Sequence, residues 1–335
     1  MKRGLILLLL LILLMCAAMC YACALARAYE RDHTTGGSAP DRPQLRPASP
    51  RRVAWPATPA LPRVTGVGRT IARAAVRRGE FGPPTAQTQT QIKQGARSLV
   101  HGATDTAMIE AAITSVVHTE VTLAAQRVRG RRPITMASTG LEPPLTAARV
   151  LAAAQQQRVP PVSFLRELLI SAGLRTSQVR AVHADPAAAA SITELLSGDF
   201  TPLFDADLSS RTNSMRAQVR AMKFEDTVSD LLTAQVGRGA YQRENDRRGV
   251  AATSSLTPDF LFKEPIMING HIIKWLDAKN YYWYGSPLTA RSVHLQAEKY
   301  TEAFGPGAFV FRHGADPQVV IGTRPSEIPP VILSL

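Results

Sequence analysis

Two aspartates and a lysine in the last third of the sequence have the types that phosphodiester hydrolysis requires. Asp259 ends a Thr-Pro-Asp sequence, and Asp277 and Lys279 are separated by a single alanine. Such hydrolysis needs a cation at the non-bridging oxygens, an activated water and stabilisation of the departing oxygen. Carboxylates bind Mg²⁺ together with waters and phosphate, and a neighbouring lysine can orient the water and offset phosphate charge. These residues are therefore candidates for a metal-dependent site.

The elements around these residues are expected to be two paired strands. Asp277 and Lys279 stand at i and i+2, so on a strand they share one face. Asn269-Gly270 separates two apolar runs and predicts a two-residue hairpin turn of the type I′ kind. The hairpin brings Asp259 beside the segment that carries Asp277.

The simplest register of that hairpin gives a conflict. Without interruption it places Asp259 opposite Asn280 and on the other face from Asp277. One inserted residue reverses the face, and Pro265 is a suitable place because it cannot donate to the ladder. We predict a bulge or break near Pro265, with the two carboxylates about 4 to 6 Å apart.

The acid-x-Lys pattern occurs once, in a sequence with few lysines. Taken alone, the pattern fits a surface ion pair on a hairpin equally well. The longer stretch TPDFLFKEPIMINGHIIKWLDAK, followed by His294-Leu295-Gln296 and by FGPG at 304–307, resembles the TPD-motif family. That family includes the codanin-interacting nuclease and belongs with the PD-(D/E)xK nucleases related to archaeal Holliday-junction resolvases. The resemblance is close over about 215–313.

The resemblance implies an α/β restriction-endonuclease-like domain over residues 211–335. It assigns Asp259 and Asp277 as metal ligands for Mg²⁺ or Mn²⁺ and Lys279 as the catalytic lysine. Glu225 matches a helical acid that would be a third ligand, and Gln296 matches a glutamine that would touch metal-bound water or phosphate. The family trio begins with Glu where this chain has Asp277. Glu225 as an exposed helix acid and Gln296 without a role remain alternatives.

Apolar periodicity predicts the helices that frame this site. One helix is expected over about 211–236 and another over about 288–303, on either side of short strands. The buried side of the first is expected to comprise Met215, Val219, Met222, Val228, Leu231 and Leu232. The aromatic run Tyr281, Tyr282, Trp283 and Tyr284 either stacks on unpaired bases or packs in the protein.

Residues 88–200 are expected to form an all-α region. The expected helices cover 90–128, 144–157, 162–172 and 187–197. The second and third have the size of a helix-turn-helix, and plain core packing is the alternative.

The first 87 residues differ from the rest in composition. Gly4 to Ala26 are uncharged and mostly apolar, which predicts a transmembrane anchor or a signal peptide within residues 1–28. Residues 29–87 are rich in Pro and Arg and are expected to be a disordered linker. Residues 1–90 hold 13 Lys and Arg against 4 Asp and Glu, most of the net charge of +13. The three cysteines all lie in the apolar run, which excludes a disulfide framework or thiolate zinc site beyond it.

Taken together, the sequence predicts a Mg²⁺-dependent endodeoxyribonuclease acting on DNA, including branched or structured DNA. A catalytically silent relative that binds DNA or a codanin-like protein partner is the first alternative. The second is a membrane-tethered interaction protein, attached through residues 4–26. The apolar segment implies a membrane or secretory location, whereas the family resemblance implies the nucleus or cytoplasm.

Overall fold

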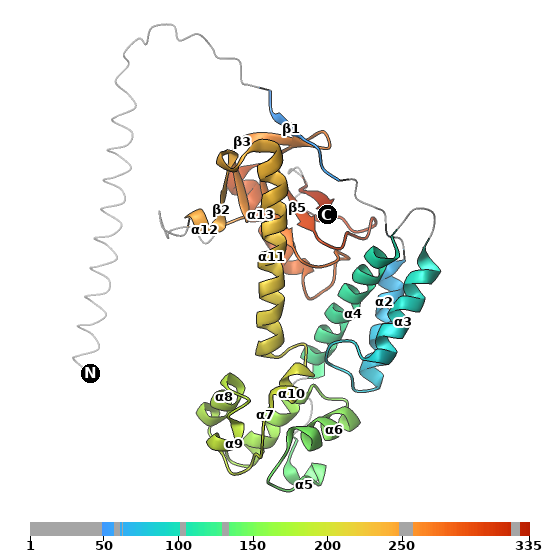
Figure 1. Cartoon of the computed structure of the whole chain (residues 1–335), viewed down its shortest axis with the longest axis vertical. Coiled ribbons are helices and arrows are strands. Elements are labelled where there is room, and N and C mark those ends of the chain that lie inside the picture. The colour runs from blue at the N-terminus through green and yellow to red at the C-terminus, as the bar shows by residue number, and fades with distance from the viewer. Residues whose placement is uncertain are drawn as a thin grey trace, which may run out of the picture. The chain divides into compact units, whose positions relative to one another are not determined.

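A computed structural model describes residues 49–56, 61, 63–100, 105–128, 134–247, 257–322 and 329–335. The expected anchor or signal peptide lies outside these residues. Along the described chain one short strand is followed by a long run of helices and then by a mixed part of strands and helices, many of them labelled in Figure 1. No helix within these ranges is both long and apolar enough to cross a bilayer.

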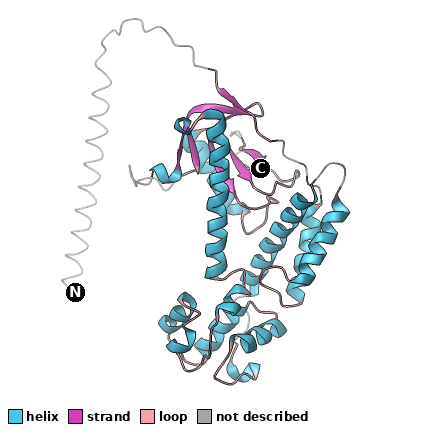
Figure 2. Ribbon diagram, in the orientation of Figure 1, coloured by secondary structure: helices cyan, strands magenta, loops and turns pink. Residues whose placement is uncertain are grey.

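A mixed sheet of six strands combines five strands from the C-terminal part of the described chain with one strand from near its start, as the strands of Figure 2 show. The strands are β1 (Arg51–Val53), β2 (Tyr241–Arg243), β3 (Phe260–Ile268), β4 (His271–Lys279), β5 (Gly307–Phe311) and β6 (Val331–Ser334). Their order is β1-β3-β4-β5-β6, with β2 also paired to β3. The pairs β2–β3 and β3–β4 are antiparallel, and β1–β3, β4–β5 and β5–β6 are parallel. A mixed α/β fold was predicted for this part, and this is confirmed.

Two helices cover this sheet with separate apolar cores. Helix α11 (Arg211–Val236) contributes Phe224, Val228 and Leu232 to a core shared with β3, β4 and β5. Helix α13 (Ala290–Phe304) packs in a second core with Trp275 and Phe309. The short elements η1 (Arg238–Ala240) and α12 (Glu244–Arg247) flank β2.

The buried side predicted for α11 is wrong in its first half. Val228 and Leu232 are fully buried, but Met215, Val219 and Met222 are 57%, 53% and 54% exposed. The three have the correct helical spacing, but no described part of the chain covers them. Periodicity identifies an apolar face without stating whether a neighbour packs on it.

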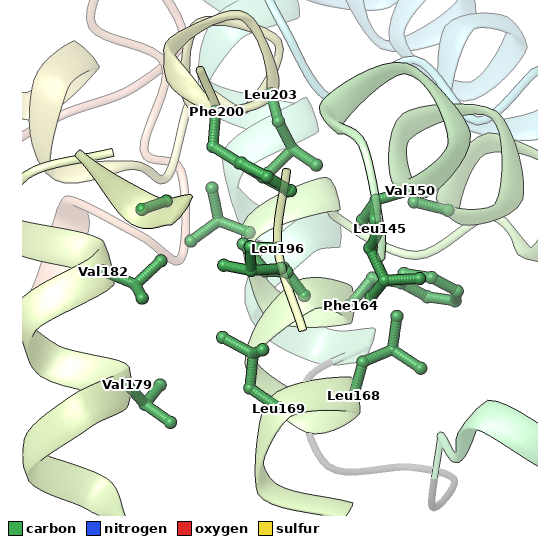
Figure 3. Close-up of a cluster of buried hydrophobic side chains, with 14 of the residues drawn as sticks. Leu145, Val150, Phe164, Leu168, Leu169, Val179, Val182, Leu196, Phe200 and Leu203 are labelled. Carbon is green, nitrogen blue, oxygen red and sulfur yellow. The ribbon is translucent and has the colours of Figure 1, made fainter. Parts of the chain in front are cut away.

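A helical region precedes α11 and has its own core (Figure 3). Its helices are α5 (Met136–Thr139), α6 (Ala147–Gln157), α7 (Pro161–Ser171), α8 (Thr176–Ala184), α9 (Ala189–Ile192) and α10 (Thr201–Asp205). Phe164, Leu168 and Leu169 of α7 are fully buried at its centre. Both helices of the suggested helix-turn-helix, α6 and α7, contribute to this core, as the packing alternative expects. The helix expected at 187–197 is wrong for most of its length, since only the four residues of α9 are helical, and α8 was not predicted.

The expectation of a disordered linker over 29–87 is wrong for part of that range. Strand β1 joins the sheet, and Trp55 Nε1 donates a hydrogen bond to Ser334 O at 2.9 Å. Helix α2 (Val64–Arg77) packs against α3 (Ala86–Leu99) and α4 (Thr106–Val128). The α2 face that packs is rich in small residues, and a Cβ at Gly68 would lie 2.6 Å from Val116. Close packing through glycine and alanine leaves little hydrophobic signal in the sequence. The single expected helix at 90–128 is two helices.

Candidate functional site

The β3–β4 hairpin determines how Asp259 and Asp277 are related. Asn269 and Gly270 both have positive φ, at 49° and 83°, as a type I′ turn requires. The register shifts between the pairs Leu261–Trp275 and Ile266–Ile273, where β3 has four residues and β4 has one. The predicted break beside Pro265 is therefore confirmed, with three extra residues instead of one.

An odd number of extra residues has the consequence that the site needs. Phe260 pairs with Leu276, so the next position along β3 brings Asp259 level with Asp277. The Ala278 backbone N–H donates to Asp259 Oδ2 at 2.7 Å. An odd shift moves Asp259 from one face of the sheet to the other. Asp259 therefore lies level with Asp277 on the adjacent strand and on the same face.

Lys279 is positioned by Asp277 and by the neighbouring strand. Its Nζ lies 2.5 Å from Asp277 Oδ1, and both side chains are almost enclosed. Nζ also lies 5.6 Å from the centre of the Phe309 ring. Parallel pairing sets Asp277 level with Phe309 on β5. The acid-x-Lys pattern is therefore a largely buried ion pair at the end of β4, and the surface ion pair considered from the sequence is wrong.

The turn between α13 and β5 fixes that neighbouring strand. Gly305 accepts a hydrogen bond from Trp275 Nε1 at 2.9 Å, and the Lys274 N–H donates to Pro306 O at 2.8 Å. A Cβ at Gly307 would meet the Trp275 indole at 2.1 Å, so only glycine fits there. The FGPG sequence therefore locks β5 against the strand that carries the candidate site.

Helix α11 brings Glu225 to the same place. A pocket of about 190 Å³ is lined by Gln218, Ala221, Met222 and Glu225 of α11, together with Arg243, Glu244 and Asp259. Arg243 Nη1 lies 2.8 Å from Asp226 Oδ1, and its Nη2 lies 4.0 Å from Glu225 Oε2. Glu225 is only partly exposed, so the alternative of a free surface acid does not describe it.

Crowding of carboxylates in a buried place alters their protonation. Burial, followed by repulsion from Asp277 and Glu225, raises the pKa of Asp259 well above its usual range. The Ala278 N–H and Lys279 act in the opposite direction and do not prevail. Burial also raises the pKa of Glu225, against the attraction of Arg243. Groups with such perturbed pKa values concentrate at functional sites.

Three residues at this site were missed from the sequence. Arg243 ends the short strand β2 and Glu244 follows it, in a segment that no motif marks, and the Glu244 backbone N–H donates to Asp259 O at 3.1 Å. Tyr300 Oη donates to Thr257 O at 3.2 Å, and its pKa is raised by burial and then by Asp277 and Asp259. These residues come from separate elements, so only the fold brings them together.

Gln296 is the predicted site residue that the structure does not join to the carboxylates. It lies half-buried on α13, one turn before Tyr300. The polar contacts made at Asp259 and Asp277 within the described ranges do not include it. The aromatic run is also settled: Tyr282, Trp283 and Tyr284 are buried in the two neighbouring cores, which favours packing over base stacking.

The donor set has the chemistry of a site for a hard divalent cation. Asp259, Asp277 and Glu225 supply carboxylate oxygens, which Mg²⁺ and Mn²⁺ prefer. In their present positions, Asp277 is paired with Lys279 and Glu225 faces Arg243. No group of three or more His, Cys, Asp or Glu side chains in the described part of the chain is arranged to hold a metal ion. The ligand types fit, and binding would require these pairs to rearrange.

The fold and this acidic pocket define a mixed α/β protein with a buried carboxylate site at a strand end. Residues 201–321 match a family model described as "Protein of unknown function TPD sequence-motif". This match supports the resemblance to the TPD family over the region that carries the site.

A viral protein is similar in sequence to one segment of this chain. The "Uncharacterized protein L539" of Acanthamoeba polyphaga mimivirus is 46% identical over 69 residues, which cover 19% of this chain and 25% of the viral protein. The chain thus spans about a quarter of that relative. No solved structure matches.

Proposed function

We propose that the protein is a metal-dependent nuclease that hydrolyses DNA phosphodiester bonds with a restriction-endonuclease-like domain of the PD-(D/E)xK type. The observation that carries the proposal is the odd register shift beside Pro265. Without it, Asp259 and Asp277 would lie on opposite faces and no shared site could form. A purely structural hairpin gains nothing from placing the half-buried Asp259 beside the buried Asp277, because the two acids repel each other.

In this proposal Asp259, Asp277 and Glu225 hold the cation. When bound, Mg²⁺ or Mn²⁺ supplies charge stabilisation and lowers the pKa of water. The high pKa of Asp259 reflects first its burial and then repulsion from Asp277 and Glu225, and a divalent cation would offset that repulsion. Removal of the Asp259 proton is therefore linked to occupation of the site.

Lys279 then acts on the phosphate and the attacking water. Its ammonium group lies beside Asp277 and is compact enough to be placed against one phosphate oxygen. Arg243, whose guanidinium lies beside Glu225, provides a second cation at the pocket that can pair with a phosphate. Tyr300 holds the Thr-Pro-Asp segment through its hydrogen bond to Thr257 O.

The test is cleavage of a supercoiled plasmid and of a branched DNA by the full chain with Mg²⁺. Asp259→Asn and Asp277→Asn should abolish cleavage, and EDTA should do the same, because a neutral amide is a poorer ligand for a hard cation. Asp230→Asn is the matched control, since Asp230 is an exposed acid of α11 outside the pocket. Cleavage that persists in both aspartate variants would assign the activity to another site or to a contaminant.

A catalytically silent protein of the same fold is the second candidate. The ion pairs that occupy Asp277 and Glu225, and the absence of a ready metal-binding group among the described residues, favour it. Binding of DNA or a codanin-like protein without cleavage by the wild-type chain, over a range of Mg²⁺ and Mn²⁺ concentrations, would support this alternative.

A further inference from the structure

The first half of α11 is exposed on almost all sides. Residues 214–220 are exposed without interruption, between a buried Asn213 and a buried Phe224. Asn213 Nδ2 donates to Asp207 O at 2.8 Å, and Phe224 belongs to the sheet core. Both ends of this stretch are therefore anchored, while its middle faces solvent. A helix that is anchored in this way needs no apolar residues in its middle.

Three large apolar side chains are nevertheless present there. Met215, Val219 and Met222 are each more than half exposed, and they account for three of the seven exposed large hydrophobic residues in the described part of the chain. At 100° per residue they lie within roughly 60° of one another on the helix. A gathering of this kind marks a binding surface more often than isolated exposed residues do.

Basic side chains border this apolar stripe on one side. Residues 211–223 contain Arg211, Arg216, Arg220 and Lys223 and no acid. Arg216 is paired with Asp205, at 2.9 Å. Arg220 and Lys223 form no ion pair with an acid in the described part of the chain. Met215, Val219 and Arg220, with their helix neighbours, line an open hollow on the surface. The charge of this side complements phosphate.

The other side of the stripe opens into the candidate site. Met222 and Gln218 line the pocket that also contains Glu225 and Asp259. Met222 is thus part of the apolar stripe and part of the acidic pocket. A strand that lies across α11 would meet basic, apolar and acidic groups in that order.

We propose that α11 from Met215 to Lys223 binds a nucleic-acid strand with unpaired bases and leads it to the carboxylate pocket; this inference rests on the proposed function and names its substrate class. Arg220 and Lys223 pair with phosphates, and Met215, Val219 and Met222 contact the faces and edges of bases. Apolar side chains including methionine can insert between bases, but in a paired duplex this requires a base step to be unstacked. Unpaired bases present their faces without that cost, so the stripe favours them over a duplex.

The chemistry selects against a protein partner as the first occupant. An amphipathic partner helix would need acids to match Arg220 and Lys223, and those acids would be repelled by the neighbouring Glu225 and Asp259. A strand that is to be cut must instead carry its phosphates into that acidic pocket with a cation. Continuity of the stripe with the pocket therefore favours the strand.

The test measures binding without cleavage. The full chain, in EDTA, is titrated into fluorescein-labelled oligo(dT) and into a hairpin duplex of equal length, with anisotropy as the readout. We expect the wild type to bind oligo(dT) more tightly. Met215→Gln with Val219→Gln should weaken oligo(dT) binding about tenfold, because two apolar side chains that bases would cover become polar, and should change hairpin binding little.

The basic pair is tested by salt dependence. Arg220→Gln with Lys223→Gln should reduce the slope of log affinity against log salt by about 0.7 for each lost phosphate contact. Arg73→Gln on α2 and Ile272→Thr on β4 are matched controls, since both residues are exposed and lie on other elements. Circular dichroism and thermal unfolding verify that the exposed substitutions leave the fold intact.

Two outcomes would overturn the inference. One is equal affinity of the wild type for oligo(dT) and hairpin, and the other is unchanged oligo(dT) binding by both double variants, which would leave the stripe to a protein partner. Plasmid cleavage by the wild type distinguishes this from failure of the proposed function. A chain that cuts DNA but binds oligo(dT) independently of α11 contradicts only this inference, and a chain that binds through α11 without cutting contradicts only the nuclease activity.

Discussion

Two aspartates, the buried Asp207 in the helical region and the half-buried Asp259 at the sheet end, have opposite surroundings. Asp207 is fully buried, and its carboxylate accepts hydrogen bonds from the Val162 N–H at 3.1 Å and from the Ser209 N–H and hydroxyl at 2.8 and 2.6 Å. Asp259 accepts one backbone N–H and faces two further acids. The surroundings of Asp207 stabilise its negative charge, whereas those of Asp259 disfavour a negative charge there.

The difference has a structural meaning. Val162 is the second residue of α7, whose N-terminal Pro160 offers no side-chain cap, so Asp207 caps that helix from 45 residues away. A negative charge at a helix N-terminus is favourable. Asp259 caps no helix and its carboxylate accepts a single backbone N–H. Asp207 is surrounded by donors, as an acid that stabilises the fold should be, whereas the surroundings of Asp259 are those that the proposed ligand role expects.

The largest expected effect is chemical. Lys279→Ala should lower the rate of DNA cleavage by about 10² to 10⁴-fold, because it removes the cation beside the attacking water. Lys279→Arg should not restore the rate, since a planar guanidinium spreads its charge over a wider group. Single-turnover cleavage at saturating Mg²⁺ measures both. Cleavage by Lys279→Ala at the wild-type rate would show that the site at the sheet end does not catalyse the reaction.

The next effect concerns stability in the helical region. Asp207→Ala should lower the free energy of unfolding by about 3 kcal/mol, because it removes the α7 cap and leaves buried donors without an acceptor. Urea denaturation of this variant and of Asp205→Ala, whose side chain is 39% exposed, gives the comparison. Equal stability of the two variants would contradict the role assigned to Asp207.

A smaller effect is expected from two histidines that are poorly placed to be charged. Burial, and then Arg220, lowers the pKa of His118 to about 4; burial, Arg312 and His118 lower the pKa of His313 to about 4. The unfolded chain takes up these protons near pH 6.5, so stability is full above that value and falls as the pH approaches 4. Each histidine should contribute ~2 kcal/mol to the loss.

This pH dependence is measured by urea denaturation between pH 7 and 4. His118→Gln with His313→Gln should flatten the profile in that window. The single variants should each remove part of the slope. A profile that is the same in the double variant and the wild type would show that other groups control acid stability.

The smallest effect runs in the opposite direction. Asp259→Asn should raise the free energy of unfolding at pH 7 by about 1 kcal/mol without metal, because it removes a charge that the site disfavours. Because the pKa of Asp259 is raised, the wild-type chain loses its stabilising protonated form as the pH rises. The extra stability of Asp259→Asn over the wild type should therefore vanish in acid, where Asp259 is protonated. A loss of stability by Asp259→Asn at pH 7 would show that Asp259, like Asp207, stabilises the fold.

The sequence predicted the features that depend on local rules. The Asn269-Gly270 turn follows from glycine-compatible dihedrals, and the break near Pro265 follows from a missing donor together with the need for one shared face. The bounds of α11 were also correct. Local rules could not give the size of the register shift, which depends on how β3 packs.

Features that depend on distant contacts were missed. Arg243, Glu244 and Tyr300 belong to three different elements and form no motif. Helix α2 was taken for linker because its packing face consists largely of small residues. The exposure of Met215 was hidden for a related reason, since a periodic apolar face does not reveal whether anything covers it.

Direct binding of Mn²⁺, followed by the electron paramagnetic resonance signal of the free ion, tests the central claim that the sheet end is a cation site. The wild-type chain should bind Mn²⁺ more tightly as the pH rises through the elevated pKa of Asp259, because binding and deprotonation are linked. Asp259→Asn should weaken binding by at least about tenfold, and Asp230→Asn should not. Equal Mn²⁺ binding by the wild type and Asp259→Asn would contradict the account.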